Sequence, residues 1–359
     1  MEILHLIQIL LLSTLSFAIA MAWTPFLTHY LYQYKCWKKK IRTVTVDGRA
    51  AEITAKIEET TNVHTPRMGG LLIWVTTFFV TMTVFFLSSI TSFPWLQDLN
   101  FFTRSQTWIP LFTLIMGSLI GLGDDLFTIY QHGESAEKGA GIRFRHRLFL
   151  VSLVGLIGGV WLYSKLGWNS IHIPFDQDII IGWLFVPLFI LVVDFFFLGT
   201  NIDGIDGLSG GMFAILLATF SVLAYARGQY DLASFCGVVF GATLAFLWFN
   251  IPPARFYMGE TGMIGLTTTL AVVAFFTDSV LLLPVIAFMI FLYVVTTFLQ
   301  LASKYLRHGK KIFLAAPIHH HFQALGWPSY KVTMRFWLIS AVTAIFGLIF
   351  ALVDVYGFY

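Results

Sequence analysis

Long apolar stretches dominate this sequence and limit what it can fold into. Of its 359 residues, 57% are hydrophobic and only 11% are charged, whereas about 25% of the residues in a typical soluble domain are charged. A helix needs about 20 apolar residues to cross a bilayer. The sequence therefore predicts an all-α polytopic membrane protein, a single integral-membrane domain over residues 1–359. Its ten transmembrane helices are expected at 4–31, 70–90, 108–126, 148–163, 179–198, 208–226, 232–249, 263–276, 280–301 and 336–355.

The basic residues predict how these helices are oriented. If the first span ends in the cytoplasm, 19 of the 22 Lys and Arg residues fall in loops on that side, and only Arg104, Lys165 and Arg227 fall on the other. Cytoplasmic loops of membrane proteins carry such an excess. An even number of spans then places both termini on the outer, periplasmic or extracellular, face. Because the basic residues are spread among loops, the sequence does not favour nucleic-acid binding.

An unusual pair of acids lies near the end of the third span, in Gly121-Leu122-Gly123-Asp124-Asp125-Leu126. Two adjacent carboxylates are costly in hydrocarbon. They are tolerated if the helix ends at the membrane surface and a divalent cation lies between them and an anionic substrate. The alternative, that they only mark where a helix meets water, explains one acid better than two. We therefore predict a functional site here.

Four other polar or glycine-rich stretches fall on the same predicted side of the membrane: 65–70, 201–207, 250–262 and 316–322. Asp203 and Asp206 are each followed by glycine, which lets backbone N–H groups approach a phosphate; a flexible turn is the alternative. Glu260 lies between two glycines and is a candidate Mg²⁺ ligand together with Asp124 and Asp125. A capped helix start explains Glu260 equally well. The convergence of these stretches predicts an active site at the cytoplasmic face.

The triple histidine His319-His320-His321 resembles a metal tract, but consecutive side chains do not all face one ion. Contact with a substrate diphosphate is the favoured interpretation, with the remaining rings packed or solvated. Arg143, Arg145 and Arg147 precede the fourth span. Most basic residues of this chain are explained by the excess of Lys and Arg in cytoplasmic loops. Arg147, which is nearest the membrane, is the one expected to reach a phosphate.

These motifs together resemble the polyprenyl-phosphate N-acetylhexosamine-1-phosphate transferases of glycosyltransferase family 4. The resemblance runs from about Thr65 to Ser340, and the proline-led triple histidine is the mark of the phospho-N-acetylmuramoyl-pentapeptide transferase branch. It is carried by Thr65-Pro66-Arg67-Met68-Gly69-Gly70, Gly123-Asp124-Asp125, Asp203-Gly204-Ile205-Asp206-Gly207-Leu208, Phe246-Leu247-Trp248-Phe249-Asn250, Met258-Gly259-Glu260 and Ala316-Pro317-Ile318-His319-His320-His321-Phe322.

The resemblance implies an enzyme of peptidoglycan synthesis, and so of cell-wall growth, cell shape and division, in the bacterial cytoplasmic (inner) membrane. Undecaprenyl phosphate attacks the β-phosphate of UDP-N-acetylmuramoyl-pentapeptide, which releases UMP and leaves lipid I. The reaction requires Mg²⁺. The family fold has ten transmembrane helices and a cytoplasmic site, commonly in a homodimer.

The resemblance also implies roles for matching residues. Asp124 deprotonates or orients the lipid phosphate, and whether it acts as base or nucleophile stays open. The other residues of the implied catalytic set are Asp125, Asp203 and His320. The implied metal ligands are Asp125, Asp203 and Glu260. Tyr257 would stack on uridine beside Asn250. The substrate-binding set is Thr65, Arg147, Asn201, Asp206, Asn250, Tyr257, His319 and His321.

The chain departs from the family pattern at several of these positions. Glu260 replaces an Asp, Arg67 replaces the second Thr of the first motif, Arg147 replaces a Lys, and Asn62 takes the place of a preceding Lys. Three alternatives follow. One is a sister transferase that uses N-acetylglucosamine 1-phosphate, another is a transporter whose intramembrane acids handle ions, and the third is an inactive relative with a scaffold role.

Overall fold

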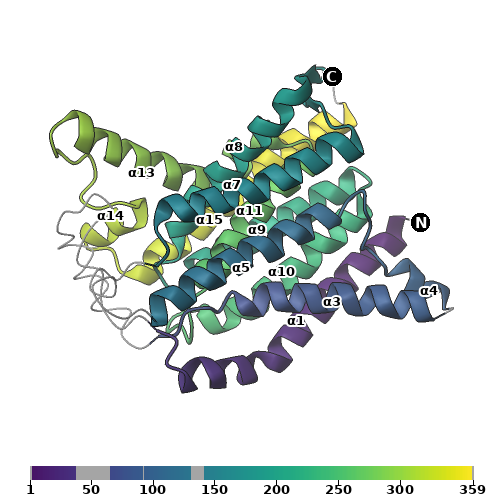
Figure 1. The fold of residues 1–359 in the computed structure, drawn as a ribbon, viewed down its shortest axis with the longest axis horizontal. Coiled ribbons are helices and arrows are strands. Elements are labelled where there is room, and N and C mark those ends of the chain that lie inside the picture. The colour runs from purple at the N-terminus through teal and green to yellow at the C-terminus, as the bar shows by residue number, and fades with distance from the viewer. Residues whose placement is uncertain (1, 38–64, 92, 131–140, 358–359) are drawn as a thin grey trace.

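The structure is a computed structural model that describes residues 2–37, 65–91, 93–130 and 141–357. Within these residues, ten helices are long and apolar enough to cross a membrane, which confirms the predicted number. In Figure 1 they form one bundle of long helices. The ten are formed by α1 (Glu2–Gln33), α3 (Leu71–Ile90), α5 (Trp108–Tyr130), α7 (Phe144–Trp161) with the turn that continues it to Leu166, α8 (Phe185–Phe197) with the 3₁₀ turns on either side of it (Gly182–Ile202 in all), α9 (Leu208–Ala226), α10 (Tyr230–Asn250), α11 (Gly259–Phe276), α13 (Phe288–Leu306) and α15 (Ser329–Tyr356).

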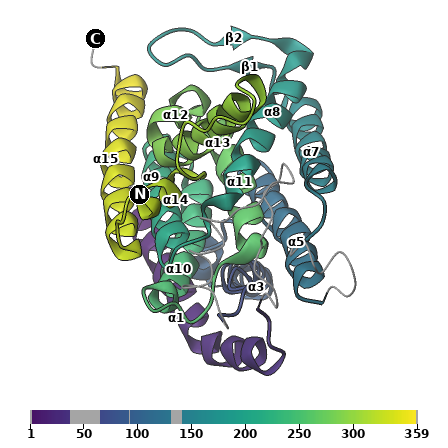
Figure 2. The ribbon, with the colours of Figure 1, turned by 90° about the vertical axis from the view of Figure 1, so that its left-hand side faces the viewer.

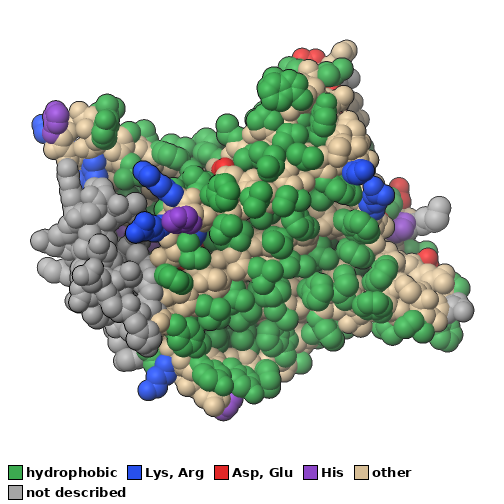
Figure 3. Space-filling model, viewed as in Figure 1, with side chains coloured by type: hydrophobic (Ala, Val, Ile, Leu, Met, Phe, Trp, Pro, Cys, Tyr) green, Lys and Arg blue, Asp and Glu red, His purple; other side chains and the backbone are tan. Residues whose placement is uncertain are grey.

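The core of the bundle is built around α11, which is buried along nearly its whole length. A helix that is apolar on all sides is suited to such a central position. Helices α5, α8 and α3 pack against it, while α1 and α15 lie at the outside (Figure 2). Hydrophobic side chains are spread across the face of the bundle that is seen in Figure 3, with few charged side chains among them. That is the surface expected of a bundle surrounded by lipid.

Several helix boundaries differ from the predicted spans. The eighth span begins at Gly259 instead of residue 263, because the glycine-rich segment around Glu260 is already helical. The ninth is broken into a 3₁₀ turn (η4, Val280–Leu282), α12 (Leu283–Ile286) and α13, since Ala287 leaves the helical conformation between them. The tenth begins at Ser329, directly after Pro328, and α14 (Ile318–Ala324) is a separate short helix.

The residues before α8 contain the main error in the predicted secondary structure. Ile179 was expected to begin a transmembrane helix, but it lies in a short antiparallel hairpin of β1 (Ser170–Ile171) and β2 (Ile179–Ile180). Helical structure resumes in a 3₁₀ turn (η2, Gly182–Leu184) ahead of α8. The intervening Pro174, Asp176 and Asp178 favour a turn over a helix. The prediction missed the turn because it was based on the apolar pattern alone. A π-helical turn (η1, Leu162–Leu166) extends α7 at the same end of the bundle.

The helices alternate in direction, so the described ends of the chain lie together at one end of the bundle (Figure 1). The opposite end holds the C-terminus of α5, the N-termini of α7, α9 and α11, and the short helix α14. The five polar stretches singled out in the sequence belong to this end. The basic residues of segment 38–64, Asn62 and Lys138 lie outside the described residues.

Candidate active site

Four buried or half-buried carboxylates gather where α5, α11 and the segment before α9 meet: Asp124, Asp125, Asp203 and Glu260, hereafter the acid cluster. Asp124 and Asp125 lie on α5 and are 4% and 0% exposed. Glu260 lies in the first turn of α11. The two helices approach closely at Gly121, where a Cβ atom would overlap the carbonyl of Glu260. Glycine at this position therefore brings the acids of both helices together.

The N-terminus of α11 holds Asp125 directly. Asp125 Oδ2 accepts hydrogen bonds from the backbone N–H of Thr261 at 2.9 Å and from its Oγ1 hydroxyl at 2.8 Å. Free N–H groups at a helix N-terminus favour a negative charge. Gly259, just before them, has φ +70°, and a Cβ there would overlap Asp125 Oδ2. Only glycine combines this left-handed conformation with so close an approach to the carboxylate.

Arg147, in the first turn of α7, bridges two acids of the cluster. Its Nη1 lies 3.2 Å from Asp124 Oδ2 and 3.0 Å from Glu260 Oε1. The other oxygen of Asp124 accepts a hydrogen bond from the backbone N–H of Ile142 at 2.6 Å. The predicted phosphate contact, Arg147, thus lies within the site, where it is already paired with carboxylates.

Arg67 is a second guanidinium in the cluster, and it was absent from the predicted site residues. Its Nε lies 3.7 Å from Asp125 Oδ1, and its side chain is 18% exposed. Burial works to lower the pKa of Arg67, but Asp125, Asp203, Glu260 and Asp124 outweigh it and raise that pKa. Its replacement of a threonine in the first motif was the sequence signal that could have identified it.

The segment around Arg67 is held against the start of α11 by backbone hydrogen bonds. Tyr257 N donates to Pro66 O, and Gly69 N and Gly70 N donate to Tyr257 O and Met258 O, each at 2.8 Å. These contacts join the first motif to residues 257–258, which lie far away in the sequence. The position of Arg67 is therefore set by the same backbone that presents Glu260.

Asp203 and Asp206 have separate partners. Asp203 Oδ2 accepts from Gly259 N at 2.8 Å, and its Oδ1 accepts from Ser209 Oγ at 2.9 Å. Burial raises the pKa of Asp203, and Arg67 opposes this shift. Asp206 Oδ1 accepts from the Tyr257 hydroxyl at 2.9 Å, and its Oδ2 accepts from Ala254 N at 3.0 Å. Burial and then the charge of Asp206 raise the pKa of Tyr257, so this phenol stays protonated.

Asn250 connects two of the polar stretches from a fully buried position. Its Oδ1 accepts from Gly207 N at 3.0 Å, and its Nδ2 donates to Phe256 O at 2.9 Å. It therefore fixes the loop of Asp203 and Asp206 against the loop of Tyr257. Its predicted contact with uridine stays a prediction, as does stacking by Tyr257.

The three consecutive histidines have three different environments. His319 is fully buried, with Nδ1 hydrogen-bonded to the Tyr293 hydroxyl and Nε2 beside Gly204. Burial, and then His320, lower the pKa of His319 well below its usual value, so the ring is neutral. His320 Nδ1 lies 2.8 Å from Gln323 Oε1, and His321 Nδ1 accepts from Leu314 N at 3.2 Å. His319 and His320 thus border the loop that carries Asp203.

Two predicted substrate contacts are not tied to the acid cluster. Thr65 is half-buried and Asn201 is exposed. Across the described ranges, neither has a hydrogen bond or ion pair with the four carboxylates. Their proposed roles depend on a substrate and stay predictions.

The acid cluster suits a magnesium ion by the chemistry of its free oxygens. Asp125 Oδ1 and Glu260 Oε2 are buried and accept no hydrogen bond in the part of the chain that is described. No three His, Cys, Asp or Glu side chains there are spaced to hold a metal ion together. Mg²⁺ usually takes only one or two protein carboxylates and completes its octahedron with water and phosphate oxygens. Asp125 and Glu260 fit this requirement, whereas both oxygens of Asp203 already accept hydrogen bonds.

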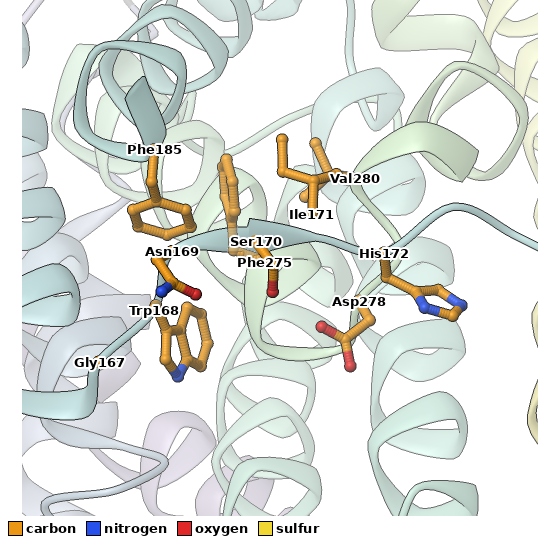
Figure 4. A pocket seen from close by; sticks show the side chains of 10 residues that line it. All are labelled: Gly167, Trp168, Asn169, Ser170, Ile171, His172, Phe185, Phe275, Asp278 and Val280. Atoms are coloured by element: carbon orange, nitrogen blue, oxygen red, sulfur yellow. The ribbon is translucent and has the colours of Figure 1, made fainter. Parts of the chain in front are cut away.

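A second polar group lies at the opposite end of the bundle, where His172 follows β1. Its ring nitrogens lie 2.8 Å from Asp178 Oδ1 and 2.7 Å from Asp354 Oδ2, and Arg227 pairs with Asp354 and Asp278. A cavity of about 160 Å³ lies alongside, with Trp168, Phe185 and Phe275 on one side and Asp278 and His172 on the other (Figure 4). These contacts join the hairpin to the C-terminal part of α15.

Comparison with known proteins shows the family to which the chain belongs. The profile of glycosyl transferase family 4 matches residues 107–278, which include Asp124, Asp203 and Glu260. A phospho-N-acetylmuramoyl-pentapeptide-transferase of Pelagibacter ubique is 30% identical over 93% of this chain and 90% of its own length. Proteins of the same name are 32% identical in Geobacillus thermodenitrificans, over 81% of this chain and 83% of theirs, and 30% identical in Chloroflexus aggregans, over 96% and 89%. The chain therefore belongs to the phospho-N-acetylmuramoyl-pentapeptide-transferase family.

Proposed function

We propose that this protein transfers phospho-N-acetylmuramoyl-pentapeptide from its UDP derivative to undecaprenyl phosphate. The products are lipid I, a membrane-bound intermediate of peptidoglycan synthesis, and UMP. The observation that carries the proposal is the bridge from Arg147 to Asp124 and Glu260. It joins two family motifs that lie more than a hundred residues apart in the sequence, those of Asp124 and Glu260, at one end of a bundle of membrane-spanning helices.

The chemistry requires two anions to meet, since a lipid phosphate attacks a diphosphate. Catalysis of phosphoryl transfer depends mainly on positioning and on electrostatic stabilisation. Asp124 would accept a proton from the lipid phosphate or orient it, and its contacts with Ile142 and Arg147, which fix the carboxylate, support this role. Arg147 supplies positive charge toward the transferred phosphate. The neutral ring of His319 and the adjacent His320 border the loop of Asp203, where a diphosphate would be held.

Asp125 and Glu260 would hold the Mg²⁺ that the family resemblance implies, with Asp203 as a further predicted ligand. When bound, the ion would neutralise charge that develops on the diphosphate and its leaving group. Asp125 is suited to this role because its Oδ2 is fixed by Thr261 and its Oδ1 stays free of hydrogen bonds. The remaining positions of the ion would be filled by water and substrate oxygens.

We assign this end of the bundle to the cytoplasmic face of the bacterial cytoplasmic membrane, with both termini outside, and the excess of basic residues in the loops at this end supports the assignment. In support of the arrangement, the described ends of the chain lie together at the other end of the bundle (Figure 1). A nucleotide-linked substrate would then reach the acid cluster from the cytoplasm, and the lipid phosphate would reach it from the inner leaflet. The homodimer implied by the resemblance belongs to this proposal as well.

Purified protein with undecaprenyl phosphate, Mg²⁺ and UDP-N-acetylmuramoyl-pentapeptide tests the donor, with release of UMP as the readout. We expect release with this donor and none above background with UDP-N-acetylglucosamine. Release only with UDP-N-acetylglucosamine would assign the chain to the sister branch. Ion flux in liposomes without release from either donor would favour a transporter.

A further inference from the structure

Arg67 stands at a position where the first motif of the family usually has threonine, and the structure gives it an unusual environment. Its Nε lies 3.7 Å from Asp125 Oδ1, and it interacts electrostatically with all four carboxylates of the acid cluster. A buried guanidinium is the cation least able to lose its charge. Its charge is therefore a fixed part of the site.

The formal charges of the acid cluster show what the charge of Arg67 adds to the site. When ionised, the four carboxylates carry four negative charges, and Arg147 and Arg67 carry two positive ones. The net charge of minus two is the amount that one divalent cation balances. Without Arg67 the same carboxylates would leave a net charge of minus three around a partly desolvated site.

Arg67 also approaches the carboxylate that is best suited to bind a metal. The oxygen it faces, Asp125 Oδ1, is one of the two buried oxygens in the cluster that accept no hydrogen bond within the described residues. A guanidinium and a divalent cation near one oxygen repel each other. Arg67 thus opposes binding of the ion at the position where Asp125 would receive it.

We propose that Arg67 is a built-in counter-charge of the acid cluster, which keeps the binding of a divalent cation at Asp125 weak until substrate arrives. Two phosphate groups then bring the negative charge that strengthens binding of the ion. The identity of the ion rests on the proposed function, but the charge balance itself does not. Arg67 acts through Asp125 and its neighbours, and so is a positioning residue.

Binding of Mn²⁺ to chelator-treated protein in a neutral detergent, followed by electron paramagnetic resonance without any substrate, tests this proposal. We expect Arg67→Thr and Arg67→Gln to bind Mn²⁺ at least tenfold more tightly than the natural protein, because a repelling charge has been removed. Arg67→Lys keeps the charge and is expected to stay within threefold. Arg145→Thr removes the same charge from an exposed position in the first turn of α7, the turn that also carries Arg147, and it is expected to leave Mn²⁺ binding unchanged.

Thermal unfolding gives a second readout that does not depend on turnover. Removal of Arg67 leaves buried carboxylates without their counter-charge, so the unfolding temperature should fall without divalent cation and rise more steeply with Mg²⁺ than in the natural protein. Unchanged or weaker Mn²⁺ binding in both Arg67→Thr and Arg67→Gln would overturn the proposal, since an arginine that only orients Asp125 predicts weaker binding. Both readouts omit the nucleotide substrate, so failure of the donor assay leaves them unaffected.

Discussion

Arg147 Nη1 lies 3.0 Å from Glu260 Oε1 and joins the first turn of α7 to the first turn of α11. Both side chains depart from the family pattern, and the structure shows that the departures meet. The longer Glu reaches the guanidinium that replaces a lysine. Because the side chains are only 17% and 14% exposed, their attraction is weakly screened by water.

We expect Arg147 and Glu260 to be energetically coupled. Arg147→Gln and Glu260→Gln should each lower the free energy of unfolding by about 1–3 kcal/mol, because each leaves a largely buried charge without its partner. The double variant should lose less than the sum of the two, with a coupling of about 1 kcal/mol or more. Unfolding in detergent measures this cycle. The exposed Arg145→Gln, combined with Glu260→Gln, is the control, and its effects should add.

Glu260→Asp tests whether the chain is an active enzyme or an inactive relative. Aspartate is the usual family residue here, and shortening the side chain by one methylene still leaves a carboxylate at the start of α11. We therefore expect turnover to be retained or raised, with the dependence on Mg²⁺ preserved. Complete loss of UMP release would mean that the longer side chain is an adapted ligand. If neither the natural protein nor Glu260→Asp released UMP, the scaffold role would be favoured.

Asn250 should contribute strongly to stability, because the oxygen and the nitrogen of its side-chain amide each form a hydrogen bond with a buried backbone group. Asn250→Leu preserves size but leaves Gly207 N–H and Phe256 C=O without partners, which should cost about 2–4 kcal/mol. The exposed Asn201→Leu is the matched control and should change stability by less than about 0.5 kcal/mol. A small effect of Asn250→Leu would show that the two loops do not depend on this amide.

The network around His172 makes stability depend on pH. Burial opposes the charge of the ring, but hydrogen bonds to Asp178 and Asp354 outweigh it and raise the pKa of His172 above its usual value near 6.5. The folded state therefore holds a proton that the unfolded state has released. This contribution is complete below pH about 6.5 and is lost as the pH rises through the folded-state pKa.

Thermal unfolding followed from about pH 6, below the usual histidine pKa, to higher pH checks this expectation. The natural protein should lose stability relative to His172→Gln as the pH rises, and the difference should be largest at the acidic end. Replacement of the exposed His308 by Gln should leave the natural slope in place. If the unfolding temperature changed with pH equally in the natural protein and in His172→Gln, the raised pKa of His172 would make no contribution to the stability of the fold.

The number of helices and the meeting of the polar stretches could be predicted from sequence, since length and hydropathy decide which segments span a bilayer. The hairpin at β1 and β2 was missed because its isoleucines continue the apolar pattern of α8. The role of Arg67 was missed for another reason. A basic residue near the predicted cytoplasmic face is explained by topology alone, and only tertiary contacts show that this one enters the acid cluster.

The partners within the site could not be predicted either. Asn250 was expected to contact uridine, yet the structure shows its amide bonding to the backbone of two loops. Such contacts depend on how helices distant in sequence are brought together, which no local pattern encodes. In contrast, the sequence analysis grouped Asp124, Asp125 and Glu260 together, and the structure shows that Gly121 and Gly259 allow α5 and the start of α11 to approach closely there.

Under the proposed function, Asp124 is a catalytic carboxylate of a phosphoglycosyl transferase. Its most direct test is UMP release from UDP-N-acetylmuramoyl-pentapeptide by Asp124→Asn, compared with Asp278→Asn, which alters an ion-paired acid at the opposite end of the bundle. We predict at least a thousandfold loss in Asp124→Asn, in a protein that still unfolds cooperatively, and near-natural turnover in Asp278→Asn. A folded Asp124→Asn that retained a tenth or more of the natural rate would contradict the account.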